Sequence, residues 1–246
     1  MEHIIKIKKN RQKLYEGSGK IIYQDSDEDT TATIFFKDDL KYNDEIKTIF
    51  GKGVINNSIS SFLMEKLDLV GIENHFIEKL NMREQEIQIL DMIPLQVRVS
   101  NVAVGDYVSK FGVQEGYLFT EPMLEFKVKN PQTKYPSINE TQIVGFNWMM
   151  PYEIKEMKRT ARRVNDFLCG FFAGVGFRLV ECSLEFGRAF NGEDFILMLA
   201  DEITPESCKL WDLKSNYRFD LETIFTSDDP IEIYKNLSKR IINLKL

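Results

Sequence analysis

FRLVECSLEFG at residues 177–187 and DFILMLAD at residues 194–201 are the two apolar-rich segments that decide the fold of this chain. Asn191-Gly192 lies between them, and this dipeptide is a strong signal for a tight turn between antiparallel strands. The sequence therefore predicts a β-hairpin over residues 177–201.

Two carboxylates on this hairpin are candidate ligands for a metal ion. If the turn is centred near residues 192–194, Glu185 and Asp201 lie opposite each other with Cβ atoms about 5 Å apart. Like charges so placed repel unless a cation lies between them, and Mg²⁺ is commonly held by one or two carboxylates together with substrate phosphates. Alternatively, the side chains reach water or a nearby basic or backbone donor, and a register shift of one residue separates them. From the residues alone, both interpretations stay open.

The segments before the hairpin are mixed in type. LYEG, KIIYQ and TTATIFF, within residues 14–36, are typical of strands, whereas the spacing of Ile59, Leu63 and Leu67 predicts a helix. EIQILDMIPLQVRV predicts two further strands broken at Pro94, since proline cannot donate to a strand ladder.

Later segments alternate strands with helices. A long amphipathic helix is expected to begin at Pro151, and a last helix near Pro230. This order favours an α+β (mixed α/β) fold over a doubly wound sheet. We place a lobe boundary near Pro94, giving a β-rich N-terminal lobe, residues 1–92, and a larger C-terminal α/β lobe, residues 93–246.

Composition narrows the function. The 246 residues carry a net charge of −6 without a basic stripe, which argues against a nucleic-acid partner. The sequence has no run of about 18 apolar residues and no signal-peptide pattern, so we expect a cytoplasmic protein without a membrane partner. Only two histidines are present, and the three cysteines match no metal-binding spacing. Any chemistry therefore rests on carboxylates, lysines and bound metal.

A glycine-rich turn, Gly17-Ser18-Gly19-Lys20, lies between two predicted strands. Its backbone N–H groups can approach a phosphate while Lys20 supplies positive charge. It is not a Walker A motif, because Ile21 follows the lysine where Ser or Thr is required. A hairpin turn with a surface lysine is the alternative interpretation.

Seven motifs, taken in order, resemble the SAICAR synthetase (phosphoribosylaminoimidazole-succinocarboxamide synthase) family over residues 12–220. They are LYEGSGK at 14–20, GKGVINN at 51–57, MIPLQVRVSNVAVG at 92–105, FGVQEG at 111–116, INE at 138–140, LEFG at 184–187 and ADEITPESCKLWD at 200–212. The resemblance implies an N-terminal nucleotide-binding lobe, a C-terminal lobe with metal and substrate sites, and an ATP cleft between them.

The resemblance also implies a reaction of purine biosynthesis. ATP activates the carboxylate of carboxyaminoimidazole ribonucleotide as an acyl phosphate, and the amino group of aspartate displaces phosphate. The implied cofactors are ATP and Mg²⁺, the partners are small-molecule substrates, and bacterial members are commonly homodimers. The expected activity is that of an ATP-dependent carbon–nitrogen ligase.

The nucleotide half of the family pattern is present. By resemblance, the cofactor-binding residues are Gly17, Ser18, Gly19, Lys20 and Lys129. Lys20, Glu185 and Asp201 are the implied catalytic residues, and Glu185 and Asp201 are also the implied metal ligands.

The substrate half departs from the family pattern. By resemblance, the candidate substrate residues are Ser100, Asp106, Glu181, Ser183 and Lys209. Ser100 and Asp106 replace an arginine and a serine that hold the ribonucleotide phosphate in the family, and Lys209 replaces another arginine. The changes at Ser100 and Asp106 disfavour a phosphate ligand, whereas Lys209 keeps the charge but loses the planar fork of arginine. Two alternatives therefore stay open: a paralogue that uses ATP on a different acceptor, and an inactive nucleotide-binding partner protein.

Overall fold

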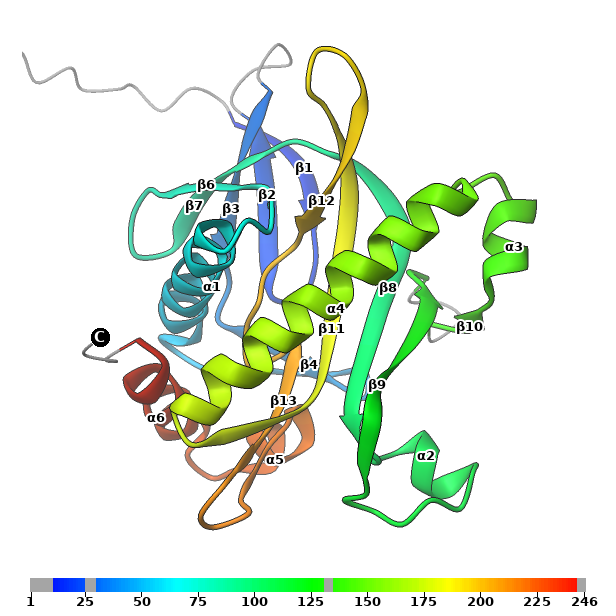
Figure 1. The fold of residues 1–246 in the computed structure, drawn as a ribbon. Coiled ribbons are helices and arrows are strands. Elements are labelled where there is room, and N and C mark those ends of the chain that lie inside the picture. Colours follow the sequence, from blue (N-terminus) through cyan, green and yellow to red (C-terminus); the bar gives the residue numbers. More distant parts are fainter. Residues whose placement is uncertain (1–10, 25–29, 131–134, 243–246) are drawn as a thin grey trace, which may run out of the picture.

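The computed structural model describes residues 11–24, 30–130 and 135–242, which form two antiparallel sheets and their covering helices (Figure 1). The first sheet has five strands. In sheet order they are β1 (Gln12–Glu16), β2 (Lys20–Gln24), β3 (Thr31–Phe36), β7 (Glu84–Gln88) and β6 (Phe76–Lys79). A separate hairpin consists of β4 (Asp39–Tyr42) and β5 (Glu45–Thr48).

The second sheet has seven strands. Six of them, in sheet order, are β10 (Ser137–Ile138), β9 (Leu118–Val128), β8 (Asp91–Val102), β11 (Phe177–Phe190), β13 (Cys208–Asp212) and β14 (Arg218–Phe219). The seventh, β12 (Phe195–Ala200), pairs with β11 and forms the predicted hairpin.

Six helices lie in the described part of the chain. They are α1 (Lys52–Leu69), α2 (Asp106–Ser109), α3 (Glu140–Gly145), α4 (Pro151–Gly174), α5 (Leu221–Thr226) and α6 (Pro230–Ile242). The predicted apolar positions of α1 are buried, and α4 and α6 begin at the predicted prolines. No helix of the described residues is long and apolar enough to span a bilayer.

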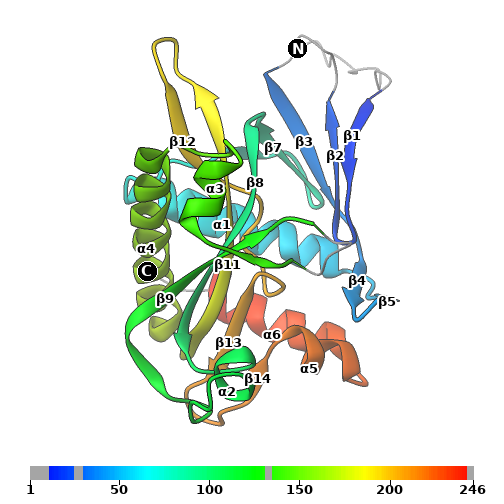
Figure 2. The ribbon, with the colours of Figure 1, turned by 90° about the vertical axis from the view of Figure 1, so that its right-hand side faces the viewer.

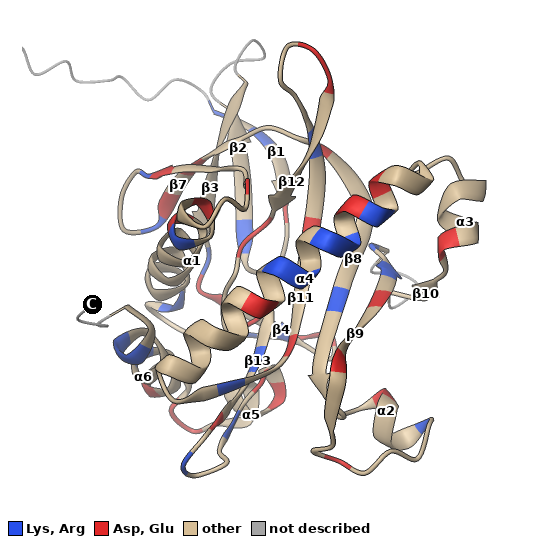
Figure 3. Cartoon of the chain, viewed as in Figure 1, with Lys and Arg blue, Asp and Glu red and all other residues tan. Residues whose placement is uncertain are grey.

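Helix α4 covers one face of the seven-stranded sheet, and Figure 2 shows it on the side of β8 and β11 away from β1–β3. Its buried stripe joins Leu95, Val97 and Val99 of β8 in the main core. Charged residues recur along α4 (Figure 3); Lys155, Arg159 and Arg162 are exposed, whereas Glu153 pairs with Arg188 of β11 at 2.6 Å. Because side chains alternate along a strand, the residues between these β8 positions lie on the opposite face of the sheet.

That opposite face is polar and positions the site. Gln96, Arg98 and Ser100 alternate with the buried residues of β8. Register places Gln96 beside Glu185 of β11, and Ser100 beside Glu181. We call this surface the polar face of the seven-stranded sheet.

The predicted strand break at Pro94 is wrong, because β8 runs through this residue from Asp91 to Val102. The register between β8 and β11 is irregular between Glu185 and Gly187, next to the proline. The Pro94 carbonyl accepts a hydrogen bond from the Lys129 backbone N–H at 3.0 Å. A strand therefore tolerates proline here, because the missing N–H falls at a bulge.

The predicted mixed α/β fold is confirmed by these two sheets and the helices that cover them. The chain passes from the first sheet to the second between Gln88 and Asp91. Helix α1 packs Leu63 and Leu67 into the same core as the seven-stranded sheet. The division into lobes at residues 92 and 93 stays a prediction.

Candidate active site

A cavity of about 280 Å³ lies between the five-stranded sheet and the β8–β11 region. Most of its wall is apolar and comes from β1, β2, β3 and the segment after β7. We call it the nucleotide cavity. Its lining residues are Leu14, Tyr15, Lys20, Ile22, Ala32, Ile34, His75, Ile87, Gln88, Ile89, Leu90, Met92, Lys129, Glu185 and Asp201.

Two lysines and two carboxylates gather in this cavity. The buried Lys20, the first residue of β2, contacts the carboxylates of Asp201 and Glu202 through its Nζ atom. Lys129, which follows β9, contacts the carboxylate of Glu185 in the same way. The structure thus brings together four residues that the sequence assigned to the nucleotide and metal sites.

The predicted cross-strand pairing of Glu185 with Asp201 is wrong. The loop of the hairpin spans residues 191–194 and is closed by Phe190 opposite Phe195, so Glu185 lies opposite Ala200. The turn is centred slightly earlier than expected, and this moves the register by one residue.

Asp201 reaches the cavity by a different route. Strand β12 ends at Ala200, and Asp201 adopts a left-handed backbone with φ 63°. Aspartate tolerates this conformation better than most residues. The carboxylate therefore leaves the strand pattern and lies beside Lys20.

His75 holds this irregular backbone in place, a role that no sequence motif indicates. Its Nε2 lies 3.0 Å from the carbonyl oxygen of Asp201. Burial lowers the pKa of the imidazole to about 3, so the ring is neutral and donates from Nε2 to the carbonyl. The backbone N–H of His75 also donates to Leu199 at 3.0 Å.

The glycine turn closes tightly on its neighbours. Gly17 donates its N–H to the Lys20 carbonyl at 2.9 Å. A Cβ at Gly19 would lie 3.4 Å from a carboxylate oxygen of Glu206, and 3.7 Å from the Nζ of Lys52. These distances are ordinary van der Waals contacts, and they place the turn directly beside a buried charged pair.

That pair, Lys52 with Glu206, is a further feature that the sequence reasoning missed. The Lys52 side chain is wholly buried, and its Nζ lies 2.7 Å from Glu206 Oε1. Asn56 also donates to this oxygen, as does the hydroxyl of Tyr234 at 3.2 Å. These contacts join α1, α6 and the segment after β12 beneath the glycine turn.

A second cavity, of about 820 Å³, adjoins this region and we call it the acceptor cavity. Three predicted substrate residues, Glu181, Ser183 and Lys209, line it together, and so does Ser18, which was predicted for the nucleotide site and does not line the nucleotide cavity. Its other lining residues are Lys41, Tyr42, Asn43, Asp44, Gln96, Tyr135, Glu202, Thr204, Pro205, Glu206, Ser207 and Leu221.

The other two predicted substrate residues do not line this cavity. Ser100 is wholly buried, and its hydroxyl lies 3.3 Å from Glu181 Oε2. Asp106 begins the short helix α2 and pairs with Lys110 at 3.1 Å. Ser100 therefore acts on the cavity only through Glu181, and Asp106 lies apart from it.

The donor chemistry of Glu185 and Asp201 fits a hard cation such as Mg²⁺. Both carboxylates line the nucleotide cavity, and each already has a lysine against it. Within the described ranges, no three His, Cys, Asp or Glu residues form a complete metal site. A cation here must therefore take its remaining ligands from phosphates and water.

Comparison with known proteins defines the class and then the family. The fold matches that of solved SAICAR synthetases, and the family model described as SAICAR synthetase matches residues 13–227. The chain belongs to the SAICAR synthetase family, as its motifs predicted.

Individual relatives cover nearly the whole chain. A protein of Rickettsia bellii (strain OSU 85-389) named phosphoribosylaminoimidazole-succinocarboxamide synthase is 51% identical over 92% of this chain and 95% of its own length. A Rickettsia rickettsii (strain Sheila Smith) protein of the same name is 50% identical, over 94% and 98%.

Solved structures agree with the fold. The synthase of this name from Ehrlichia chaffeensis has a TM-score of 0.89 at 36% identity, covering 96% of this chain and all of the other. A SAICAR synthetase in complex with ADP has a TM-score of 0.87 at 33% identity, over 94% and 98% of the two chains.

Proposed function

We propose that this chain is an ATP-dependent carbon–nitrogen ligase that joins aspartate to carboxyaminoimidazole ribonucleotide, the SAICAR synthetase reaction of purine biosynthesis. The observation that supports this proposal most directly is that one lysine contacts a lining residue of each cavity. Lys20 contacts Asp201, which lines the nucleotide cavity, and Glu202, which lines the acceptor cavity. A phosphoryl group can therefore pass between two ligands beside Lys20.

The nucleotide cavity is the proposed ATP site. Its apolar wall, with Ile22, Ala32 and Ile34, suits a planar base, and Lys20 and Lys129 suit the phosphates. The ADP complex of a structural neighbour supports this assignment. We place Gly17, Ser18 and Gly19 at the phosphate end because they precede Lys20 in a tight turn.

Glu185 and Asp201 are the proposed Mg²⁺ ligands. Bound with ATP, Mg²⁺ supplies charge neutralisation on the transferring phosphoryl group. Lys20 and Lys129 then exchange their carboxylate partners for phosphate oxygens. The two carboxylates thus serve as resting partners for the lysines and as ligands in the loaded site.

The proposed reaction has two steps. A carboxylate oxygen of the acceptor attacks the γ-phosphorus of ATP, the bond to the bridging oxygen breaks, and ADP leaves. The amino nitrogen of aspartate then attacks the acyl carbon, loses a proton, and phosphate leaves with the C–O bond electrons. Lys20 stabilises the negative charge that the phosphoryl oxygens carry.

Steady-state turnover tests this function. Purified protein is incubated with ATP, Mg²⁺, aspartate and the ribonucleotide, and ADP release is followed with amide product formation. We expect ADP release that depends on both aspartate and the ribonucleotide. ADP release that needs neither compound contradicts the proposed reaction.

A second candidate is a ligase for a different carboxylate acceptor. It is favoured by Glu181, an acidic side chain that lines the acceptor cavity and pairs with Lys209 at 3.1 Å. Phosphoryl transfer to another carboxylate, found by screening, together with no turnover of the ribonucleotide, supports it. A cytoplasmic location and a homodimer stay predictions.

A further inference from the structure

Lys209 lines the acceptor cavity and is a donor of the kind an anion site needs, but the chain supplies the anion itself. Ser100, Glu181 and Lys209 lie side by side on β8, β11 and β13. Glu181 Oε1 lies 3.1 Å from the Nζ of Lys209. Its Oε2 lies 3.3 Å from the Ser100 hydroxyl and 3.8 Å from the Nε of Arg98.

These three donors are of the types that bind phosphate. Lysine, arginine and hydroxyl groups all donate to phosphate oxygens, and arginine and lysine do so with full charge. Glu181 is largely shielded from water, with 10% of its side chain exposed. Its carboxylate therefore takes up Lys209 and the Ser100 hydroxyl, while the Arg98 guanidinium donates to Glu125.

The remaining charges of the acceptor cavity are also paired. Among its described lining residues, Lys41 contacts Asp44 at 3.2 Å and Lys209 contacts Glu181. Glu202 and Glu206 are held by Lys20 and Lys52. No lining lysine in the described ranges is left without a carboxylate, so an entering anion must displace one.

We propose that Glu181 is a specificity-determining residue that competes with the anionic group of an acceptor for Lys209, which lines the acceptor cavity beside it. This inference rests on the proposed function only in treating the cavity as the acceptor site. A phosphorylated acceptor binds by displacing the Glu181 carboxylate, and its affinity is lowered by the strength of that internal contact. An acceptor without a phosphate at this position meets no such competition.

Calorimetric binding of ribose 5-phosphate to the full chain tests the competition without needing turnover. Glu181→Gln keeps the shape of the side chain and removes its charge. We expect its affinity for ribose 5-phosphate to rise on the order of tenfold over the wild type, because Lys209 loses its internal anion. Binding of uncharged ribose stays unchanged.

Two further variants separate local competition from general charge. Asp44→Asn removes one negative charge from the same cavity but leaves Lys209 and Arg98 paired. We expect this variant to gain less than about threefold, by screening of its exposed charge. Adding Lys209→Met to Glu181→Gln should remove most of the gain.

Glu181→Ser serves as a second variant, with the same expected gain, and circular dichroism reports whether each variant is folded. Equal affinities of the wild type and both folded Glu181 variants overturn the proposal, as does an equal gain from Asp44→Asn. Absence of ribonucleotide turnover by the wild type would contradict the proposed function but would not test the role of Glu181. The gain in ribose 5-phosphate affinity decides the role of Glu181 separately.

Discussion

The nucleotide cavity and the acceptor cavity meet at Lys20 but differ in how their charges are arranged. In the nucleotide cavity, two lysines contact two carboxylates at one end of an otherwise apolar wall. In the acceptor cavity, most of the lining residues are polar, and Glu181 lies within reach of Lys209 and Arg98.

This difference separates the chemistry of ATP from the choice of acceptor. Carboxylates in the nucleotide cavity can pass from a lysine to a cation, so that the lysines become available to phosphates. Glu181 has no such second partner in the proposed reaction, and it therefore weakens anion binding. Lysine–carboxylate pairs thus favour phosphate binding in the nucleotide cavity and disfavour anion binding in the acceptor cavity.

Lys20→Met should give the largest effect, because this lysine adjoins both cavities. We expect turnover to fall on the order of 10²- to 10³-fold, since a charge that stabilises the transferring phosphoryl group is lost. Lys13→Met is the matched control, because Lys13 lies on the neighbouring strand and pairs with Glu16 at the surface. The measurement is steady-state ADP release.

A similar loss in both lysine variants would show that Lys20 has no special role. Retained turnover in Lys20→Met, with a folded protein, would break the link between the two cavities. The thermal melting temperature of each variant is measured as well, to show that any loss of turnover does not come from unfolding.

Ser100→Arg sharpens the contrast at the acceptor cavity. Ser100 is buried against Glu181, so an arginine there pairs first with this carboxylate. We expect little gain in ribose 5-phosphate affinity from Ser100→Arg alone, below about threefold. Combined with Glu181→Gln, the new arginine faces no internal anion, and we expect a gain on the order of tenfold or more.

Calorimetry on the two single variants and the double variant measures this coupling. A large gain from Ser100→Arg alone would mean that Glu181 does not hold the new cation. Additive effects of the two changes would likewise argue against competition at one position.

His75→Ala should act on the nucleotide cavity alone. The imidazole holds the left-handed backbone of Asp201, so its loss misplaces that carboxylate. We expect Mg²⁺-dependent kcat to fall on the order of tenfold, as for other groups that orient a metal ligand. His75→Gln keeps a side-chain N–H donor and should restore part of the rate.

The readout is kcat as a function of Mg²⁺ concentration, with the affinity for ribose 5-phosphate measured beside it. Equal loss in the alanine and glutamine variants would point to packing rather than to the hydrogen bond. A change in ribose 5-phosphate affinity would show that the two cavities are not separable here.

Ile22→Ala should give the smallest effect. Ile22 lines the apolar wall of the nucleotide cavity, and shortening it removes methylene groups worth about 0.8 kcal/mol each. We expect ATP affinity to fall by up to about tenfold without a change in ribose 5-phosphate binding. Ile46→Ala is the control, because Ile46 is exposed on β5 and lies outside the cavity.

Fluorescence titration with a labelled adenine nucleotide measures this change. A loss of equal size in the control would mean that general destabilisation, rather than wall contact, lowers the affinity.

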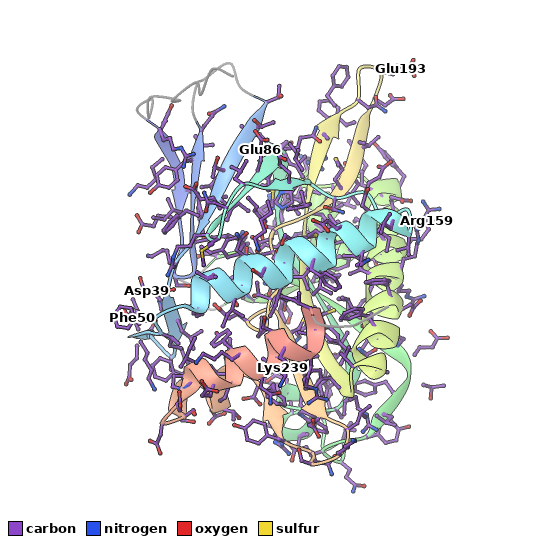
Figure 4. The ribbon with its side chains drawn as sticks, turned by 90° about the vertical axis from the view of Figure 1, so that its left-hand side faces the viewer. Asp39, Phe50, Glu86, Arg159, Glu193 and Lys239 are labelled. Atoms are coloured by element: carbon purple, nitrogen blue, oxygen red, sulfur yellow. The ribbon has the colours of Figure 1, made fainter. Side chains whose placement is uncertain are left out.

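Much of the fold could be predicted because its periodic segments are strong. The buried stripe of α4 and the apolar runs of β11 and β12 follow from spacing alone. Pro94 misled the strand prediction, because a proline rule cannot tell a bulge from a strand end. Figure 4 shows Glu193 at the tip of the hairpin, where one residue of turn geometry fixes the register of the whole strand.

The site could be predicted only in part. The family motifs assigned Lys20, Glu185 and Asp201 to one site, and all three line the nucleotide cavity. The cross-strand pairing of Glu185 with Asp201, which was argued from the register, was wrong. His75 and the buried Lys52 gave no signal, because their roles depend on partners more than 100 residues away in sequence. Such long-range contacts have no local periodicity to detect.

The metal role of Glu185 and Asp201 is the central claim, and ATP titration with and without Mg²⁺ tests it most directly. Asp194→Asn, at the hairpin tip beside Glu193, is the matched control for both carboxylate variants (Figure 4). We predict that Glu185→Gln and Asp201→Asn each lose the gain in ATP affinity that Mg²⁺ gives the wild type, while Asp194→Asn keeps it. Wild-type Mg²⁺-dependent affinity in both carboxylate variants would contradict the account.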